Sequence, residues 1–157
     1  MNSLTIGVIS DTHGLLRPEA LAALQGSDFI LHAGDIGNPK ILDKLNTIAP
    51  VTAVRGNIDR DFWAKSIPET NVLEAGGLSI YMLHNLDTLD LKPRAAGFSA
   101  VIYGHSHKPA QELKAGVLFF NPGSAGPRRF RLPISVGILR IENGELRAEA
   151  KPLTVSE

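Results

Sequence analysis

Short hydrophobic runs alternate with polar segments along this chain, and five of the runs lead into side chains that can bind a metal ion. The runs are rich in β-branched residues and are bounded by glycine or polar residues, a pattern that predicts buried β-strands. The predicted strands and the polar residues after them are 4–10 before Asp11 and His13, 28–33 before Asp35, 51–55 before Asn57, 78–83 before His84, and 100–103 before His105 and His107.

The segments between these runs predict an α/β fold. Residues 18–24 begin with a proline at a plausible first helical position, and residues 39–48 carry apolar side chains at helical spacing. Strands that alternate with helices predict parallel pairing in the first half of the chain. The second half favours a second, mixed sheet, because three dipeptides typical of hairpin turns separate apolar runs there: Gly76-Gly77, Ala115-Gly116 and Asn143-Gly144.

The polar residues after the strands are expected to meet in one place. Functional crevices of α/β sheets lie beyond the carboxyl ends of the strands. In an extended segment, side chains at i and i+2 point the same way, so Asp11 with His13 and His105 with His107 can each grip a common centre. Oxygen and imidazole donors without any cysteine suit hard or borderline divalent ions, and seven donors are too many for one ion.

The order of these elements resembles that of the binuclear calcineurin-like metallophosphoesterases, and in particular of their small single-domain phosphodiesterase branch. That family has Asp-x-His, Gly-Asp, Gly-Asn, a lone His and Gly-His-x-His in sequence. The corresponding segments of this chain are 11–13, 34–35, 56–57, His84 and 104–107. The resemblance covers nearly the whole chain, and five elements in the right order are far more specific than any one of them.

The resemblance implies a single domain over residues 1–157 with a four-layer α/β/β/α sandwich of two mixed β-sheets. It also implies two metal ions bridged by Asp35. One ion would be held by Asp11, His13, Asp35 and His107, and the other by Asp35, Asn57, His84 and His105. Manganese is the ion that we expect, with nickel, zinc, iron, cobalt or magnesium as alternatives.

The activity that we expect is hydrolysis of a phosphodiester by in-line attack of a hydroxide that bridges the two ions, with Asp35, Asn57 and His84 taking part in catalysis. Many phosphoprotein phosphatases of the superfamily have His after the motif Asn, where this chain has Ile58. Isoleucine cannot protonate a leaving group, and Asp59 is the neighbouring acidic residue. A phosphomonoesterase or nucleotide pyrophosphatase with the same site is one alternative, and a non-catalytic scaffold of the same fold is another.

Four further residues are candidates for substrate binding. Asn85 stands where the family usually has glycine, so its side chain would either crowd the metal or form a hydrogen bond to bound phosphate. Asn121 opens a segment that leads to the rim of the site in the family, although an ordinary Pro-Gly turn explains that segment equally well. Arg128 and Arg129 suit bidentate contact with phosphate, and a subunit contact in a homo-oligomer is the alternative. His32 lies inside a strand, so we expect a buried imidazole with satisfied nitrogens or a partner of Asp35.

The composition agrees with a compact enzyme and excludes several other classes. Sixteen basic residues balance sixteen acidic ones, so no overall field attracts nucleic acid or a membrane. Without cysteine there is no disulfide framework, and no apolar stretch approaches the ~20 residues of a membrane span. We therefore expect a cytoplasmic protein whose partner is a small-molecule phosphate ester.

Overall fold

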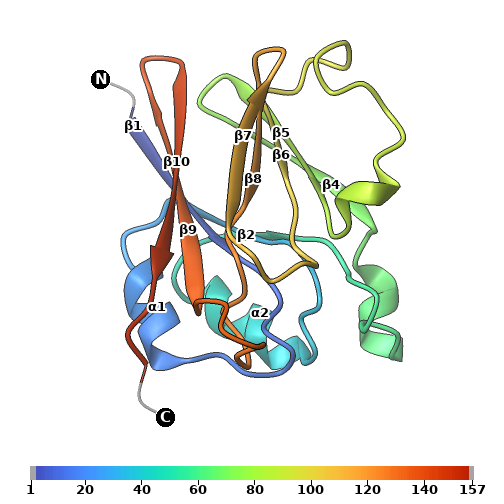
Figure 1. The fold of residues 1–157 in the computed structure, drawn as a ribbon, viewed down its shortest axis with the longest axis vertical. Helices are drawn as coiled ribbons and strands as arrows, with labels where there is room; N and C mark the ends of the chain where they lie inside the picture. Colours follow the sequence, from blue (N-terminus) through green and yellow to red (C-terminus); the bar gives the residue numbers. More distant parts are fainter. Residues whose placement is uncertain (1–2, 156–157) are drawn as a thin grey trace.

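Two mixed β-sheets packed face to face form the centre of the molecule in the computed structural model, which describes residues 3–155 (Figure 1). The first sheet has the strand order β10-β9-β1-β2-β3. β1, β2 and β3 are parallel, whereas β9 is antiparallel to both β1 and β10. The strands are β1 (Ser3–Ile9), β2 (Phe29–His32), β3 (Val51–Ala53), β9 (Ser135–Glu142) and β10 (Glu145–Pro152).

The second sheet has the order β4-β5-β6-β8-β7. Its central pairs β5-β6 and β6-β8 are parallel, and its outer pairs β4-β5 and β7-β8 are antiparallel. The strands are β4 (Thr70–Ala75), β5 (Leu78–Leu83), β6 (Ala100–Ile102), β7 (Ala110–Lys114) and β8 (Val117–Asn121). The mixed second sheet predicted from the hairpin signals is therefore confirmed.

Three hydrophobic layers hold the sandwich together. Between the sheets, buried side chains such as Ile6, Met82 and Phe120 form the main core, and each such side chain contributes about 1.5–3 kcal/mol on burial. The helices α1 (Pro18–Leu24) and α2 (Pro39–Asn46) cover the outer face of the first sheet. The outer face of the second sheet packs against residues from the segment 86–98, which contains the 3-10 helix η2 (Leu86–Thr88).

The four-layer α/β fold is confirmed, although its fourth layer is a short 3-10 helix with irregular chain and not an α-helix. Helix α1 has the predicted bounds, whereas α2 ends two residues before the predicted position 48. The side chain of Asn46 accepts a hydrogen bond from the amide of Val51 at 3.2 Å, which turns the chain toward β3. The ends of the predicted domain, residues 1–2 and 156–157, lie outside the described residues.

The packing brings the carboxyl ends of strands from both sheets to one edge of the sandwich. The amide of Asp11, after β1, bonds to the carbonyl of Gly34, after β2, at 2.9 Å. In the second sheet, the amide of Gly104, after β6, bonds to the carbonyl of His84, after β5, at 3.0 Å. Between the two sheets, the amide of His105 donates to Oδ2 of Asp11 at 3.1 Å. The loops that follow these four strands are therefore neighbours, and they carry six of the seven predicted ligands, all except Asn57. Among residues 3–155, no helix is long and apolar enough to cross a membrane.

Candidate metal centre

Five of the seven predicted ligands have left-handed backbone conformations. The φ angles are 55° for Asp11, 48° for His13, 55° for Asp35, 74° for His105 and 64° for His107. Such angles disfavour residues with a Cβ by about 1–3 kcal/mol each, and strain of this kind gathers at functional sites. Asp11 and His13 fall in one group of possible metal ligands, as predicted, whereas His105 and His107 fall in two different groups, so the prediction that this pair grips one centre is wrong. The stated reason is wrong for both pairs, because these residues have left-handed φ angles and are not extended chain.

The glycines before the ligands serve two different purposes. Gly34 has a φ of 102°, a dihedral angle that residues with a Cβ rarely adopt. Gly56 and Gly104 are instead required for space. A Cβ at Gly56 would lie 2.1 Å from Oδ1 of Asp35, and one at Gly104 would lie 2.1 Å from Oγ of Ser10. These two glycines allow the ligand loops of different strands to touch.

The first cluster consists of Asp11, His13 and His107. Oδ1 of Asp11 is 3.8 Å from Nε2 of His13 and 3.5 Å from Nε2 of His107. Oδ1 of Asp11 and Nε2 of His13 are buried and have no hydrogen-bond partner among residues 3–155. Because an unpaired buried polar atom is strongly unfavourable, these facing orphan atoms fit a bound cation.

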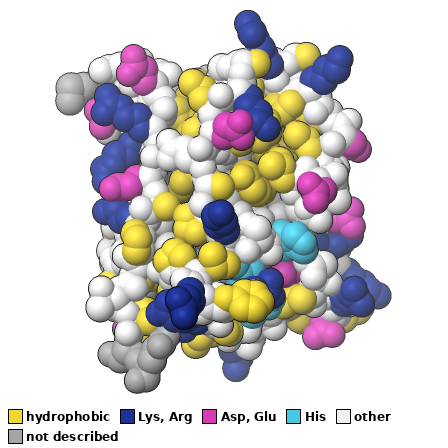
Figure 2. Space-filling model, in the orientation of Figure 1, with side chains coloured by type: hydrophobic (Ala, Val, Ile, Leu, Met, Phe, Trp, Pro, Cys, Tyr) yellow, Lys and Arg dark blue, Asp and Glu magenta, His cyan; other side chains and the backbone are white. Residues whose placement is uncertain are grey.

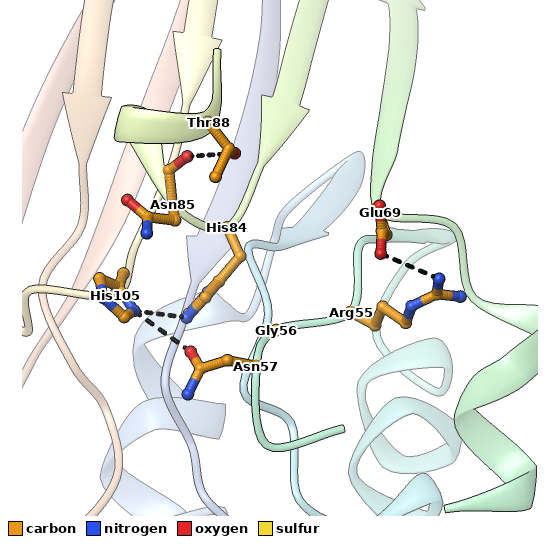
Figure 3. Close-up of a pocket in the computed structure, with 8 residues that line it drawn as sticks. All are labelled: Arg55, Gly56, Asn57, Glu69, His84, Asn85, Thr88 and His105. Atoms are coloured by element: carbon orange, nitrogen blue, oxygen red, sulfur yellow. Dashed lines mark hydrogen bonds and ion pairs between the residues drawn. The ribbon is translucent and has the colours of Figure 1, made fainter. Parts of the chain in front are cut away.

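The second cluster consists of Asp35, His84 and His105, with Asn57 beside it. Nε2 of His84 is 3.2 Å from Oδ2 of Asp35 and 3.3 Å from Nδ1 of His105. Oδ1 of Asn57 is 3.2 Å from the same Nδ1 of His105 (Figure 3). Figure 3 shows these three side chains from separate loops pointing at one another, the arrangement that ligands of one cation adopt.

Asp35 lies between the two clusters. Its Oδ2 is 3.5 Å from Nε2 of His13 in the first cluster and 3.2 Å from Nε2 of His84 in the second. Its other oxygen, Oδ1, accepts the amide of Ile58 at 3.1 Å, which fixes the carboxylate plane. Oδ1 of Asp11 also comes within 3.8 Å of Nε2 of His84. The contact of Asp35 with His84 is shorter, so Asp35 is the carboxylate better placed to touch cations in both clusters.

Electrostatics in the centre favour ionised carboxylates. Burial alone would raise the pKa of Asp11 and of Asp35, but the neighbouring histidines outweigh it, and both pKa values are lowered. Burial opposes charge on His84 as well, yet its contact with Asp35 and the charge of Asp11 raise its pKa. For His107, burial prevails over the charge of Asp11 and the pKa is lowered. The site therefore presents negative charge that attracts a divalent ion.

Hydrogen bonds behind the ligands fix the histidine orientations. Nδ1 of His84 is 2.7 Å from the carbonyl of Ala33, so Nδ1 carries the proton and Nε2 presents its lone pair to the centre. His32 is fully buried, and burial lowers its pKa to about 4. Nδ1 of His32 accepts the amide of Gly34, and Nε2 contacts Oγ1 of Thr12 at 3.0 Å. His32 thus has satisfied nitrogens, as predicted, and supports Thr12.

Asp59 is part of the frame of the site. It is 4% exposed, and its Oδ2 accepts the amides of Ile36 at 3.0 Å and Gly56 at 2.8 Å. Oδ1 accepts the amide of Gly37 at 3.0 Å. Asp59 therefore ties the loop of Asp35 to the loop of Asn57, and its acceptor atoms face backbone amides instead of a substrate.

Two cavities border the metal centre, one at each cluster. One of about 270 Å³ borders the second cluster and is lined by Arg55, Gly56, Asn57, Glu69, His84, Asn85, Thr88 and His105 (Figure 3). The other, of about 190 Å³, borders the first cluster and is lined by His13, His107, Pro127, Arg128 and Arg129. Sequence reasoning missed the ion pair of 3.1 Å between Arg55 and Glu69 in the larger cavity. The position of Arg55 directly before Gly56-Asn57 was the available signal.

The predicted substrate-binding residues are placed unequally. Asn85 lines the larger cavity, and its Oδ1 accepts the amide of Asp87 at 3.0 Å. Arg128 and Arg129 line the smaller cavity, and Nη1 of Arg128 donates to the carbonyl of Leu132 at 3.3 Å. The prediction for Asn121 is wrong, because its side chain is fully buried.

The side chain of Asn121 holds the loop of the two histidine ligands. Its Nδ2 donates to the carbonyl of Gly104 at 3.0 Å and contacts Oγ of Ser106 at 3.1 Å. Its Oδ1 accepts the amide of Gly123 at 2.9 Å. Asn121 has its polar atoms engaged within the protein, so it positions ligands and does not contact substrate.

Comparison with known proteins agrees with this geometry. Residues 4–144 match the model of the calcineurin-like phosphoesterase superfamily domain. The chain belongs to that superfamily. A probable metallophosphoesterase of Methanothermobacter thermautotrophicus is 37% identical, with 93% of this chain and 91% of the relative aligned. The metal dependence of the superfamily agrees with the two clusters of His and Asp residues in this structure.

Solved structures show the same fold. A structure described as a novel archaeal phosphodiesterase has a TM-score of 0.77 and 25% identity, covering 94% of this chain and 100% of its own. Vacuolar protein sorting 29 of Cryptosporidium parvum has a TM-score of 0.75 at 19% identity, covering 94% of this chain and 96% of its own. The second likeness shows the fold alone.

Proposed function

We propose that this phosphoesterase-family protein is a binuclear metal-dependent phosphodiesterase that cleaves a small-molecule phosphate ester. The observation that carries the proposal is the position of Asp35, whose Oδ2 lies 3.5 Å from His13 and 3.2 Å from His84 and so reaches both clusters. A single carboxylate shared by two donor sets is the arrangement that holds two cations close together.

The donor set defines which residues hold each ion. Asp11, His13 and His107 would bind the first ion and Asn57, His84 and His105 the second, with Asp35 shared. Mixed oxygen and imidazole donors without sulfur suit manganese, which is the ion that we propose. When bound, a pair of divalent ions supplies an activated water for in-line attack at phosphorus and neutralises charge on the phosphoryl oxygens.

The side chains of the site have separate tasks in this reaction. His84 keeps its proton on Nδ1 through the 2.7 Å contact with Ala33, so its Nε2 is free to act as a neutral ligand. Asn57 offers an amide oxygen directly beside the second cluster. Ile58, which is 41% exposed after Asn57, has no proton to donate. Leaving groups that depart without protonation, such as aryl oxyanions, are therefore the preferred ones.

A diester is favoured over a monoester by the two cavities. A phosphodiester has two ester arms, and a cavity of about 270 Å³ borders the second cluster while one of about 190 Å³ borders the first. A monoester needs only one of them. A non-catalytic scaffold with a vestigial site is disfavoured. The strained turns and the buried unpaired atoms of Asp11 and His13 are unfavourable in free energy, and without a metal nothing compensates for them.

Replacement of Asp35 tests the proposal. Asp35→Ala should lower bound manganese from about two ions to one or none and abolish hydrolysis of bis(p-nitrophenyl) phosphate, since one carboxylate serves both clusters. Asp43→Ala, which removes an exposed carboxylate on helix α2, is the matched control and should leave both unchanged. Metal content by elemental analysis and steady-state rates are the measurements. Full turnover by metal-free Asp35→Ala protein would refute the binuclear mechanism.

A further inference from the structure

The loop 127–133 begins directly after a segment that is bonded to the backbone of Ser10 and Asp11. Just before it, Oγ of Ser124 donates to the carbonyl of Asp11 at 3.0 Å, and the amide of Ala125 bonds to the carbonyl of Ser10 at 3.1 Å. A Cβ at Gly126 would lie 2.4 Å from the carbonyl oxygen of Asp11. The start of the loop is therefore fixed against the segment that carries a predicted metal ligand.

The tip of this loop is an ordered turn with a strained, exposed aromatic residue. The amide of Leu132 bonds to the carbonyl of Arg129 at 3.1 Å and closes the turn. Phe130 within it has a φ of 53° and a side chain that is 89% exposed. Exposure of a phenyl ring is unfavourable and so is a left-handed φ at an aromatic residue. Exposure alone is shared by Phe62, but Phe130 combines it with a strained backbone and with a place directly after Arg129, a wall residue of the cavity at the first cluster, and this combination points to a ligand.

The cation next to this ring faces the metal centre. Arg129 lines the cavity of about 190 Å³ together with His13 and His107. Figure 2 shows hydrophobic and basic side chains directly beside the exposed histidine atoms on this face. Phe130 follows Arg129 directly in the chain, so it stands one residue from the wall of the cavity that contains the two histidines.

The cavity at the second cluster differs in character. Arg55 is paired there with Glu69 at 3.1 Å, and the remaining wall residues include Asn85 and Thr88, whose side chains are polar and uncharged. Such a wall suits a polar or small arm. Only the cavity beside Phe130 combines a basic rim with an aromatic neighbour, so the two arms of a diester meet different surroundings.

We propose that the loop 127–133 is a specificity element that binds an aromatic ester arm of the substrate, with the ring stacked on Phe130 and phosphoryl oxygens facing Arg129. The substrate class that follows is a nucleoside phosphodiester, because the base of its nucleoside arm offers a planar π-face to Phe130 and the phosphoryl group to which that arm is joined offers the anion to Arg129. This inference rests on the proposed phosphodiesterase activity.

Two substrates with the same leaving group test the inference on manganese-loaded protein: the p-nitrophenyl ester of thymidine 5′-monophosphate and methyl p-nitrophenyl phosphate. Phe130→Ala should lower kcat/KM about tenfold for the thymidine ester, the effect of losing one base-aromatic stack, and leave the methyl ester unchanged. Phe130→Trp should restore the preference. Phe62→Ala is the matched control, because Phe62 is 85% exposed and lines neither cavity.

A binding measurement complements the kinetics. Calorimetry should show weaker binding of thymidine 5′-monophosphate to the Phe130→Ala protein and equal binding of methyl phosphate. Arg129→Ala should instead weaken the binding of both compounds, since a guanidinium that contacts the phosphoryl group does not distinguish the two ester arms.

Different failures have different meanings. If the unmodified protein hydrolyses neither ester, the proposed function fails. If it hydrolyses both and Phe130→Ala changes neither ratio nor binding, or if Phe130→Ala changes the mass measured by light scattering, the aromatic-arm inference is overturned while the phosphodiesterase proposal stands. Phe130→Ala should lower the Tm no more than Phe62→Ala does, because both rings are exposed in the folded state.

Discussion

Asp59 offers the sharpest test of how the site is held together. Its carboxylate receives three backbone amides, from Ile36, Gly37 and Gly56, at 2.8 to 3.0 Å. We consider the isosteric change Asp59→Asn, which preserves shape but replaces one acceptor oxygen with a donor group. Because the side chain is 4% exposed, water cannot readily replace the lost acceptor.

The size of the effect follows from the three bonds. A hydrogen bond to a charged group contributes about 1.5–3 kcal/mol and one to a neutral group about 1 kcal/mol. The best placed asparagine keeps its oxygen toward Ile36 and Gly56, so two bonds survive in weaker form. Its amide group then faces the N–H of Gly37, which loses its acceptor at about 1–3 kcal/mol. We expect a total loss of about 2–5 kcal/mol in the free energy of unfolding.

Urea denaturation of metal-free protein near neutral pH measures this loss, and Asp61→Asn is the matched control because Asp61 is exposed and makes no capping bond to η1 (Phe62–Ser66). Calorimetry should also show weaker manganese binding in Asp59→Asn, since the loops of Asp35 and Asn57 lose their tie. A free energy of unfolding within about 0.5 kcal/mol of the unmodified protein, the usual range for surface changes, would refute the role of Asp59 as a frame residue.

Two further predictions concern the leaving group and pH. Rates over a series of aryl phosphodiesters should rise steeply as the leaving-group pKa falls, and Ile58→His, at an exposed position, should flatten that slope; an already flat slope in the unmodified protein would show that another group donates the proton. The raised pKa of His84 stabilises the metal-free fold below the ordinary value of 6.5, and this stabilisation is lost as pH rises through the raised value. Manganese binds only neutral His84. The rise in Tm that manganese produces should therefore be larger at about pH 8 than at about pH 6. A smaller rise at the higher pH would contradict the assignment of His84 as a ligand.

The sequence was sufficient to predict that the proposed ligands lie together, because their spacing is local and ordered. Asp11 and His13, or His105 and His107, are two positions apart and follow strands that can be recognised from their apolar runs. The left-handed turns that aim them were not predictable, because residues other than glycine rarely adopt such angles.

Contacts between distant segments were the part that sequence could not supply. The side chain of Asn121 could serve equally well to bind a substrate or to stabilise the protein interior, so its residue type does not distinguish the two roles. Only the fold shows that it is buried and bonds to the carbonyl of Gly104. The pairing of Arg55 with Glu69 likewise depends on how β3 and β4 lie together. Burial and long-range pairing are properties of the packed sandwich and not of any one segment.

The place of β1 in its sheet has a consequence for biosynthesis. β1 carries Asp11 at its end, yet one of its two edges pairs with β9, whose residues 135–142 are made after all seven predicted ligands. A nascent chain that already contains every ligand therefore still has an open edge on β1, and Ser124 and Ala125 are not yet locked against Asp11 by a complete sheet. Pairing over such a separation is slow compared with local structure. We therefore expect metal capture in the native geometry to follow the pairing of β1 with β9.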